Sequence, residues 1–151
     1  MKTPTSIGTV KANKVTPIPI KLMEGEVRKL NAKYPCGKVS AGIGKRAVEL
    51  VRLYLRKRYP GCRFRENPKK GVDLAIDSPK MLIEIKGTED KDISWGKLKV
   101  SGKTSYLNLT EKRVRIYRVT DVYGRVPQIH ELVYGKHFKL TCEPRWRFVR
   151  L

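Results

Sequence analysis

Two acidic residues and one lysine lie within the most strand-like part of a very basic chain. The segment GVDLAIDSPKMLIEIKG, residues 71–87, contains Asp73, Glu84 and Lys86. Its alternation of apolar and polar residues predicts two strands, VDLAI and MLIEIKG, joined by a turn at DSPK. If these strands pair as a hairpin, the two carboxylates converge and Lys86 lies one side-chain repeat further along the same face.

Such a grouping could carry out phosphodiester chemistry. Two carboxylates that share a site raise the pKa of one of them, unless a divalent cation neutralises both. Ligation by oxygen atoms alone suits Mg²⁺ or Mn²⁺, which bind through one or two carboxylates together with water and substrate phosphate. The ammonium group of Lys86 could then orient a water molecule toward phosphorus and offset charge in the transition state.

Simpler interpretations of the same residues exist. A glutamate and a lysine two positions apart are typical of the solvent face of a strand, and a structural salt bridge would also place opposite charges there. Lys86 could equally protect an edge strand from pairing with another chain. The amphipathic helix before the hairpin, the acid at hairpin distance and the net charge favour a nuclease-type site.

The composition predicts one domain and a polyanionic partner. The chain has 151 residues, of which 40% are hydrophobic, and 34 Lys and Arg against 14 Asp and Glu give a formal charge of +20. Nucleic acid is the partner that best matches this charge. No apolar run has the length of a membrane span and no secretory signal is visible, so we expect a cytoplasmic protein without a membrane partner.

The pattern along the chain predicts an α/β fold, in which a mixed sheet is flanked by helices. Residues 1–40 are expected to form an irregular basic arm, with VTPIPIKL as a possible edge strand and EGEVRKLNAKY as a possible short helix. A domain over 41–151 follows, and GKRAVELVRLYLRKRYPG gives its clearest helix. RVRIYRVTDV, KHFKL and WRFVRL are further strand candidates, whereas residues 91–112 show no assignable pattern.

A basic tract leads directly into the hairpin. Residues 56–70 hold seven Lys and Arg against one acid, with Tyr59 and Phe64 interleaved. Phosphate contacts beside a scissile bond would explain this run, although charge runs are often only solvated faces. The predicted nucleic-acid contacts are Arg56, Arg58, Arg63, Arg65, Lys69, Lys70, Lys97, Lys99 and Lys103, with Arg145, Trp146 and Arg147 as weaker candidates.

The cysteines and histidines suggest no metal site. The three cysteines, Cys36, Cys62 and Cys142, lack the spacing of zinc ligands. The two histidines, His130 and His137, have no partner spacing that indicates metal binding or base catalysis, so we interpret both as structural.

The spacing of the acids and the lysine resembles that of the PD-(D/E)xK nucleases. Eleven positions separate Asp73 from the triplet Glu84-Ile85-Lys86, and Val72 stands where the family name has proline. The resemblance covers about residues 42–120. IEIKGT and IYRVTDV look most like the NO VEIN C-terminal-type branch, and archaeal Holliday junction resolvases are also similar.

The resemblance implies a fold and a set of roles. The restriction-endonuclease-like core of this family has a helix, three strands that begin with a hairpin, a second helix and a fourth strand, and its members cut DNA with Mg²⁺. By this resemblance Asp73 and Glu84 are metal ligands, the Ile85 carbonyl is a third ligand, Lys86 is the catalytic lysine and Glu49 is an acid contributed by the helix.

The expected activity is therefore that of a Mg²⁺-dependent DNA endonuclease that leaves 5′-phosphate and 3′-hydroxyl ends. Cutting both strands of a duplex with one site per chain predicts a homodimer. The alternatives are a non-catalytic nucleic-acid-binding protein that retains the nuclease fold, and a basic RNA-binding protein.

Overall fold

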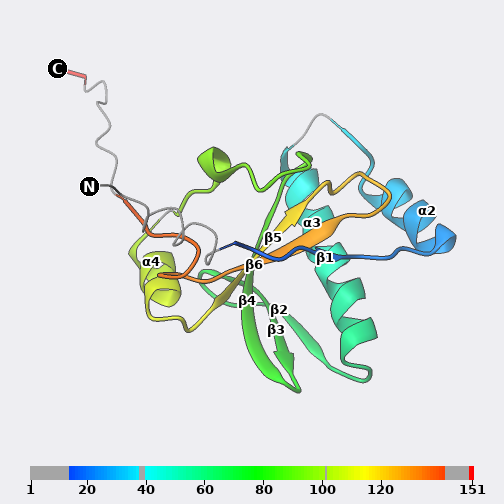
Figure 1. The fold of residues 1–151 in the computed structure, drawn as a ribbon, viewed down its shortest axis with the longest axis horizontal. Coiled ribbons are helices and arrows are strands. Elements are labelled where there is room, and N and C mark those ends of the chain that lie inside the picture. Colours follow the sequence, from blue (N-terminus) through cyan, green and yellow to red (C-terminus); the bar gives the residue numbers. More distant parts are fainter. Residues whose placement is uncertain (1–13, 38–39, 101, 142–149) are drawn as a thin grey trace, which may run out of the picture.

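The computed structural model of the chain describes residues 14–37, 40–100, 102–141 and 150–151. The strands form one sheet, and the helices lie around it (Figure 1). In chain order the elements are β1 (Ile18–Pro19), α2 (Glu24–Lys33), α3 (Ser40–Arg58), β2 (Phe64–Lys69), β3 (Val72–Asp77), β4 (Lys80–Gly87), the 3-10 helix η1 (Trp95–Lys97), α4 (Lys103–Thr110), β5 (Arg115–Thr120) and β6 (Gln128–Leu132).

The six strands form one mixed sheet in the order β1-β6-β5-β4-β3-β2. All neighbouring strands are antiparallel except β4 and β5, which are parallel. A parallel pair needs a crossover connection, and η1 and α4 lie within this one. The predicted α/β class with a mixed sheet is therefore confirmed.

Helix α3 covers one face of the sheet. Ala47, Leu50, Val51 and Leu55 recur on its inner side at helical spacing and are fully buried. They share a core with the strand residues Leu74, Ile76, Met81, Ile83 and Ile85, so the alternate residues of β3 and β4 project from the opposite face. Both the helix and the hairpin predicted from the sequence are present.

The opposite face has a smaller core. Leu109 of α4 packs there with Ile116 of β5 and Leu132 of β6. Helix α4 lies in the segment that the sequence left unassigned, because KTSYLNLT has only one short apolar stripe and its N-cap residue makes no side-chain capping bond. Packing of Leu109 against the sheet, rather than intrinsic propensity, explains why this segment is helical.

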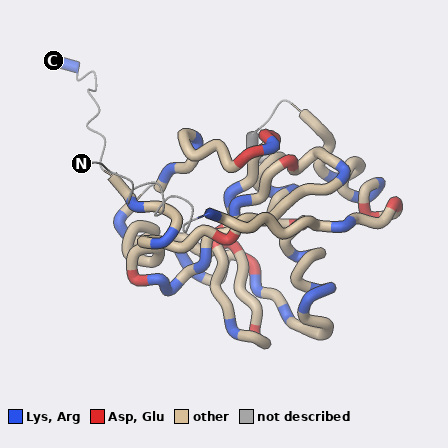
Figure 2. Tube along the Cα trace, in the orientation of Figure 1, with Lys and Arg blue, Asp and Glu red and all other residues tan. Residues whose placement is uncertain are grey.

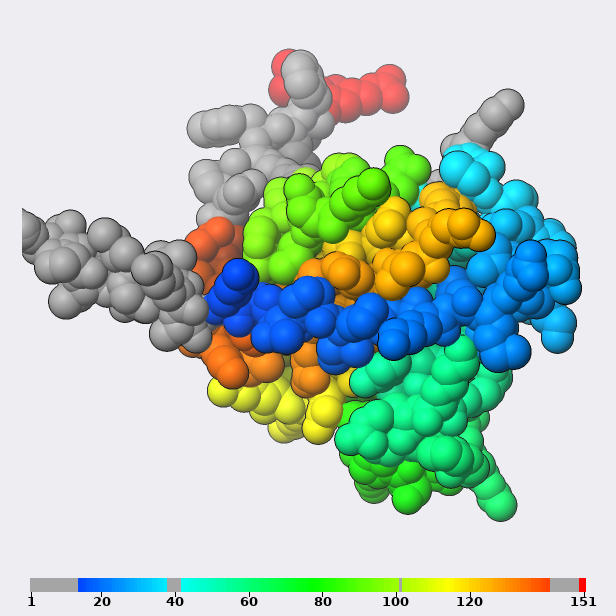
Figure 3. Space-filling view, turned by 45° about the vertical axis from the view of Figure 1, so that its right-hand side comes forward, coloured from blue at the N-terminus to red at the C-terminus, as the bar shows by residue number. Residues whose placement is uncertain are grey.

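The N-terminal segment is more ordered than the arm that the sequence predicted. The possible edge strand forms as β1, in which Ile18 pairs with Ile129 of β6. The possible short helix forms as α2. Ile20 and Leu30 are buried in the core beneath α3. Figure 3 shows this segment lying across one face of the molecule. The expected boundary at residue 40 stays a prediction, because residues 38 and 39 lie outside the described residues. The predicted arm residues 1–13 lie outside the described residues.

Other strands differ from those expected. The polar tract FRENPK forms edge strand β2, and QIHEL forms β6. KHFKL contributes only an isolated bridge between Tyr134 and Phe138, and WRFVRL lies mostly outside the described residues. Of the helices in the described ranges, none combines the length and the apolar character that a membrane crossing requires.

Candidate active site

The register of the β3–β4 hairpin brings the two predicted acids together. The paired register ends at Leu74 and Ile83, and Asp73 and Glu84 are the next residues of the two strands. The Ile85 backbone N–H donates a hydrogen bond to Asp73 Oδ2 at 2.7 Å. The Asp73 carboxylate therefore reaches across to the backbone of the ExK triplet, whereas the Ile85 side chain belongs to the core under α3.

The two acids influence each other. Burial raises the pKa of Glu84 above its usual value; the charge of Lys86 opposes this rise, and the charge of Asp73 adds to it. Both carboxylates are partly exposed rather than sealed in the core. A half-buried pair of like charges is the arrangement that the sequence predicted for a cation site.

Lys86 lies on the same face as Glu84, one side-chain repeat along β4. In the parallel pairing of β4 with β5, Lys86 is opposite Arg118 and Glu84 is opposite Ile116. Lys86 also lines a cavity of about 110 Å³ on this face. The structure thus brings Asp73, Glu84 and Lys86 to one surface that α3 does not cover.

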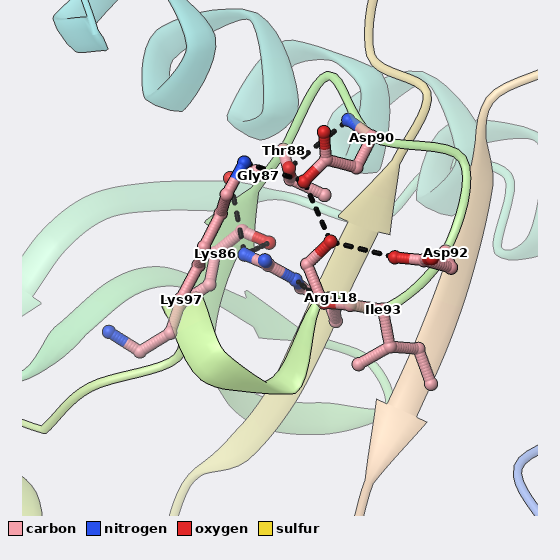
Figure 4. A network of polar contacts seen from close by, with 9 residues as sticks. Lys86, Gly87, Thr88, Asp90, Asp92, Ile93, Lys97 and Arg118 are labelled. Carbon is pink, nitrogen blue, oxygen red and sulfur yellow. Dashed lines mark hydrogen bonds and ion pairs between the residues drawn. The ribbon is translucent and has the colours of Figure 1, made fainter.

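Arg118 fixes the end of strand β4, as Figure 4 shows. Only 3% of this residue is exposed. Its guanidinium donates to the Ile93 carbonyl at 2.8 Å, the Lys86 carbonyl at 3.3 Å and the Gly87 carbonyl at 3.2 Å. Burial lowers the pKa of Arg118, and Asp90 and Asp92 oppose this shift. The arginine therefore holds the backbone just after the ExK triplet to the loop that follows it.

That loop carries its own charge network. Asp90 accepts hydrogen bonds from Lys97 Nζ and Ser94 Oγ, each at 2.7 Å, and these contacts lower the pKa of Asp90 to about 2. Lys97 was a predicted nucleic-acid contact, and in the structure its ammonium group is already paired.

Close packing also requires glycine immediately after Lys86. A Cβ on Gly87 would lie 2.7 Å from Ala47 Cβ and 3.1 Å from the Ile43 carbonyl oxygen. Helix α3 can therefore approach the end of β4 only because residue 87 has no side chain. This contact sets the helix against the strand that carries Glu84 and Lys86.

The structure does not bring Glu49 to the acid pair. Glu49 is on α3, which packs against the face of Ile83 and Ile85, and its carboxylate lies 3.8 Å from Arg56. Within the described ranges, no group of three or more His, Cys, Asp or Glu side chains is placed to hold a metal ion.

The predicted DNA contacts divide between two faces of the sheet. Arg56 stacks over Phe64, whose strand partner Ile76 belongs to the core under α3. Arg65 is paired with Ala75, so it projects from the face of Asp73. Figure 2 shows that basic residues are spread over many elements, although β1, β3 and β6 carry none. Arg56 and Arg58 lie on or near the α3 face, and Arg63 lies at the edge of the hairpin. Lys69 and Lys70 lie at the β2–β3 turn. Lys99 lines the cavity, and Lys103 begins α4.

The histidines have structural contacts. His130 Nε2 lies 3.1 Å from Thr120 Oγ1, and burial lowers the pKa of His130, as does the charge of Arg118. His137 Nδ1 accepts a hydrogen bond from the Val133 backbone N–H at 3.0 Å. These contacts agree with the structural interpretation. Cys36 and Cys62 are free thiols, and Cys142 lies outside the described residues.

Comparisons of the chain with protein-family models, with curated proteins and with solved structures found no match. The residue that sequence reasoning missed is Arg118. Its signal was an arginine inside the apolar strand IYRVT, because a cation at such a position needs buried acceptors.

Proposed function

We propose that this chain is a metal-dependent DNA endonuclease of the PD-(D/E)xK type. The observation that carries the proposal is the end of the β3–β4 pairing, where Asp73 accepts the Ile85 N–H beside Glu84, and Lys86 lies on the same open face. The order of elements supports a restriction-endonuclease-like core, because α3 precedes three antiparallel strands, and α4 then leads to β5, which is parallel to β4. The net charge of +20 suits a polyanionic substrate.

The residues present fit a Mg²⁺ or Mn²⁺ ion. The hydrogen bond from Ile85 orients Asp73 Oδ2 and leaves Oδ1 as the oxygen for a cation. Glu84 must be ionised to act as a ligand, and its raised pKa makes ligation dependent on pH. Two carboxylates are enough for a hydrated ion whose remaining positions are filled by water, a backbone carbonyl such as that of Ile85, and phosphate oxygens. When bound, the ion would polarise the phosphate and activate water.

The chain supplies the other elements of the reaction. The Lys86 ammonium group donates hydrogen bonds to the attacking water or to a non-bridging phosphate oxygen, and its charge stabilises the transition state. Arg118 acts as a positioning residue, because it binds the Lys86 carbonyl and fixes the backbone that carries the lysine. Arg65 and Lys99 on the same side of the sheet would contact phosphates flanking the scissile bond.

Cleavage of a supercoiled plasmid tests this proposal. The wild type should nick the plasmid with Mg²⁺ or Mn²⁺ but not with EDTA. Lys86→Ala should slow cutting about 10²–10³-fold, the usual cost of removing one transition-state donor. It should bind DNA almost normally, because 33 of the 34 basic residues remain. Lys80→Ala, at the exposed start of the same strand, is the matched control and should cut as the wild type does. Nicking that is equal in EDTA, or no cutting with either metal, would contradict the proposal.

A second function is favoured by one observation: within the described part of the chain, no third His, Cys, Asp or Glu joins Asp73 and Glu84 in a group that could hold a metal ion. A protein that keeps the nuclease fold without cutting would bind DNA through its basic surface alone. Calorimetric titration with Mn²⁺ separates the two functions, because a non-catalytic site shows no metal binding that depends on Asp73 and Glu84.

Cutting of both duplex strands would be simplest with two chains related by a two-fold axis, so we further propose a homodimer on DNA. Sedimentation of the protein with and without duplex tests this point. A complex that contains one chain per duplex at micromolar concentration would contradict it.

A further inference from the structure

A cleft begins at Lys86 and runs along the face of the sheet that carries the acid pair. It consists of two adjoining cavities of about 110 Å³ and about 230 Å³. The two cavities share three apolar lining residues, Ile116, Leu132 and Phe138. The smaller cavity is next to Lys86, and the larger one extends away from it along β5 and β6.

The lining of this cleft is apolar and aromatic, with cations among the polar groups. Ile116 and Leu132 belong to the core on this face, and Phe138 packs partly against them. Trp95 lines the smaller cavity and is 46% exposed. The basic lining residues are Lys86, Lys99 and Lys139 in the smaller cavity, and Lys112 and Arg115 in the larger one. The lining includes one acid, Glu131, which faces Arg115 at 3.8 Å.

This combination matches an unpaired nucleotide strand better than a duplex. A duplex presents phosphates outward and keeps its bases stacked, so it binds basic surfaces and gains little from an apolar recess. An unpaired strand exposes base faces, which stack on aromatic side chains while lysines contact the phosphates between them. A strand whose phosphate lies at Asp73 and Glu84 would meet Trp95 and the apolar floor directly beyond Lys86.

We propose that the cleft binds unpaired nucleotides of DNA next to the phosphate to be cut, so that the preferred substrates carry a single-stranded tail or flap. The proposal rests on the nuclease function proposed above and adds the class of DNA substrate to it. Trp95 is the residue that stacks on the bases, and Lys99 and Lys139 contact the phosphates of the unpaired strand.

Binding in EDTA tests the proposal without any dependence on cleavage. Fluorescence anisotropy would compare a blunt duplex with the same duplex carrying a single-stranded tail. The wild type should bind the tailed duplex more tightly. Trp95→Ala should weaken binding of the tailed duplex by about tenfold, because one base stack contributes roughly 1–3 kcal/mol, and should change binding of the blunt duplex by no more than about twofold.

Tyr106→Ala is the matched control. Tyr106 is also an aromatic residue with 46% exposure, and it lines neither cavity. It should leave the ratio of the two affinities unchanged. A second pair, Lys139→Ala against Lys136→Ala, repeats the comparison for a lysine inside the cleft and an exposed lysine outside it.

Three results would overturn the proposal: equal binding of both DNAs by the wild type, equal effects of Trp95→Ala and Tyr106→Ala, or an equal loss on both DNAs for Trp95→Ala. The plasmid assay is separate. If no DNA is cut with Mg²⁺ but Trp95→Ala still removes the preference for the tail, the nuclease function fails while the assignment of the cleft stands.

Discussion

Replacement of Asp73 by asparagine separates a metal site from a structural ion pair. The substitution keeps the shape of the side chain and an oxygen that can still accept the Ile85 N–H. It removes one of the two negative charges that face each other across β3 and β4. Folding stability without metal and the response to metal should therefore change in different ways.

The expected change in stability without metal is small. A hydrogen bond to a charged acceptor contributes about 1.5–3 kcal/mol and one to a neutral acceptor about 0.5–1.5, so the substitution costs about 1 kcal/mol. Relief of repulsion between like charges on opposite strands returns about 0.2–1 kcal/mol. The free energy of unfolding should thus stay within about 1 kcal/mol of the wild type, or about 2–4 °C in Tm for a chain of this size.

The expected change in the response to metal is larger. An ion present at about 100 times its Kd stabilises the folded state by about 2.7 kcal/mol, which raises Tm by roughly 5–11 °C. The wild type should show this rise with Mn²⁺ or Mg²⁺, and Asp73→Asn should lose it. Differential scanning calorimetry in EDTA and in a metal series measures both quantities.

Asp77→Asn is the control for this experiment. Asp77 lies at the other end of β3 and accepts one backbone N–H, from Arg63 at 3.0 Å. It should keep the full response to metal. If Asp73 served mainly as the partner of Lys86 in a buried pair, Asp73→Asn would lower stability without metal by about 3–5 kcal/mol. Such a loss, with no metal response in the wild type, would refute the catalytic interpretation of the hairpin.

Three further outcomes follow from neighbouring residues. Because burial raises the pKa of Glu84, the folded state holds its proton more tightly than the unfolded state does, so in EDTA this group's contribution to stability is lost as pH rises through the raised pKa. Glu84→Gln should remove that part of the pH dependence, as urea unfolding across the acid to neutral range would show. Glu49→Gln should leave the rate of plasmid cutting unchanged, because the Glu49 carboxylate pairs with Arg56. A large loss of rate would show that Glu49 takes part in catalysis. Arg118→Lys should cost about 2–3 kcal/mol in urea unfolding, because one ammonium group cannot replace donors to three carbonyls, and unchanged stability would contradict that role.

The hairpin and helix α3 could be predicted because their signals are local. Alternation over residues 72–77 and 80–87, with a turn of polar residues and proline between them, fixes which side chains face α3. The helix has a continuous apolar stripe that ends before Pro60 and Gly61. The position of the candidate site followed from these two elements alone.

The remaining elements depend on contacts with distant parts of the chain. FRENPK has one large apolar residue. This segment becomes strand β2 because it pairs with the free edge of β3. QIHEL is short and becomes β6 through pairing with β5 on one side and β1 on the other. The local sequence around Arg118 indicates a buried cation, but its acceptor carbonyls lie up to 32 positions away, so the local pattern does not identify them.

The charge balance around the hairpin favours a divalent ion over lysine alone. Two carboxylates meet at β3 and β4, and the cation that lowers the pKa of Glu84 is Lys86, with a single charge. Two further cations near the end of β4 have other partners, because Arg118 donates to backbone carbonyls and Lys97 is paired with Asp90. Lys86 therefore offers one positive charge to two carboxylates. A bound Mg²⁺ or Mn²⁺ would neutralise the two carboxylates and leave the Lys86 ammonium group available to water and phosphate.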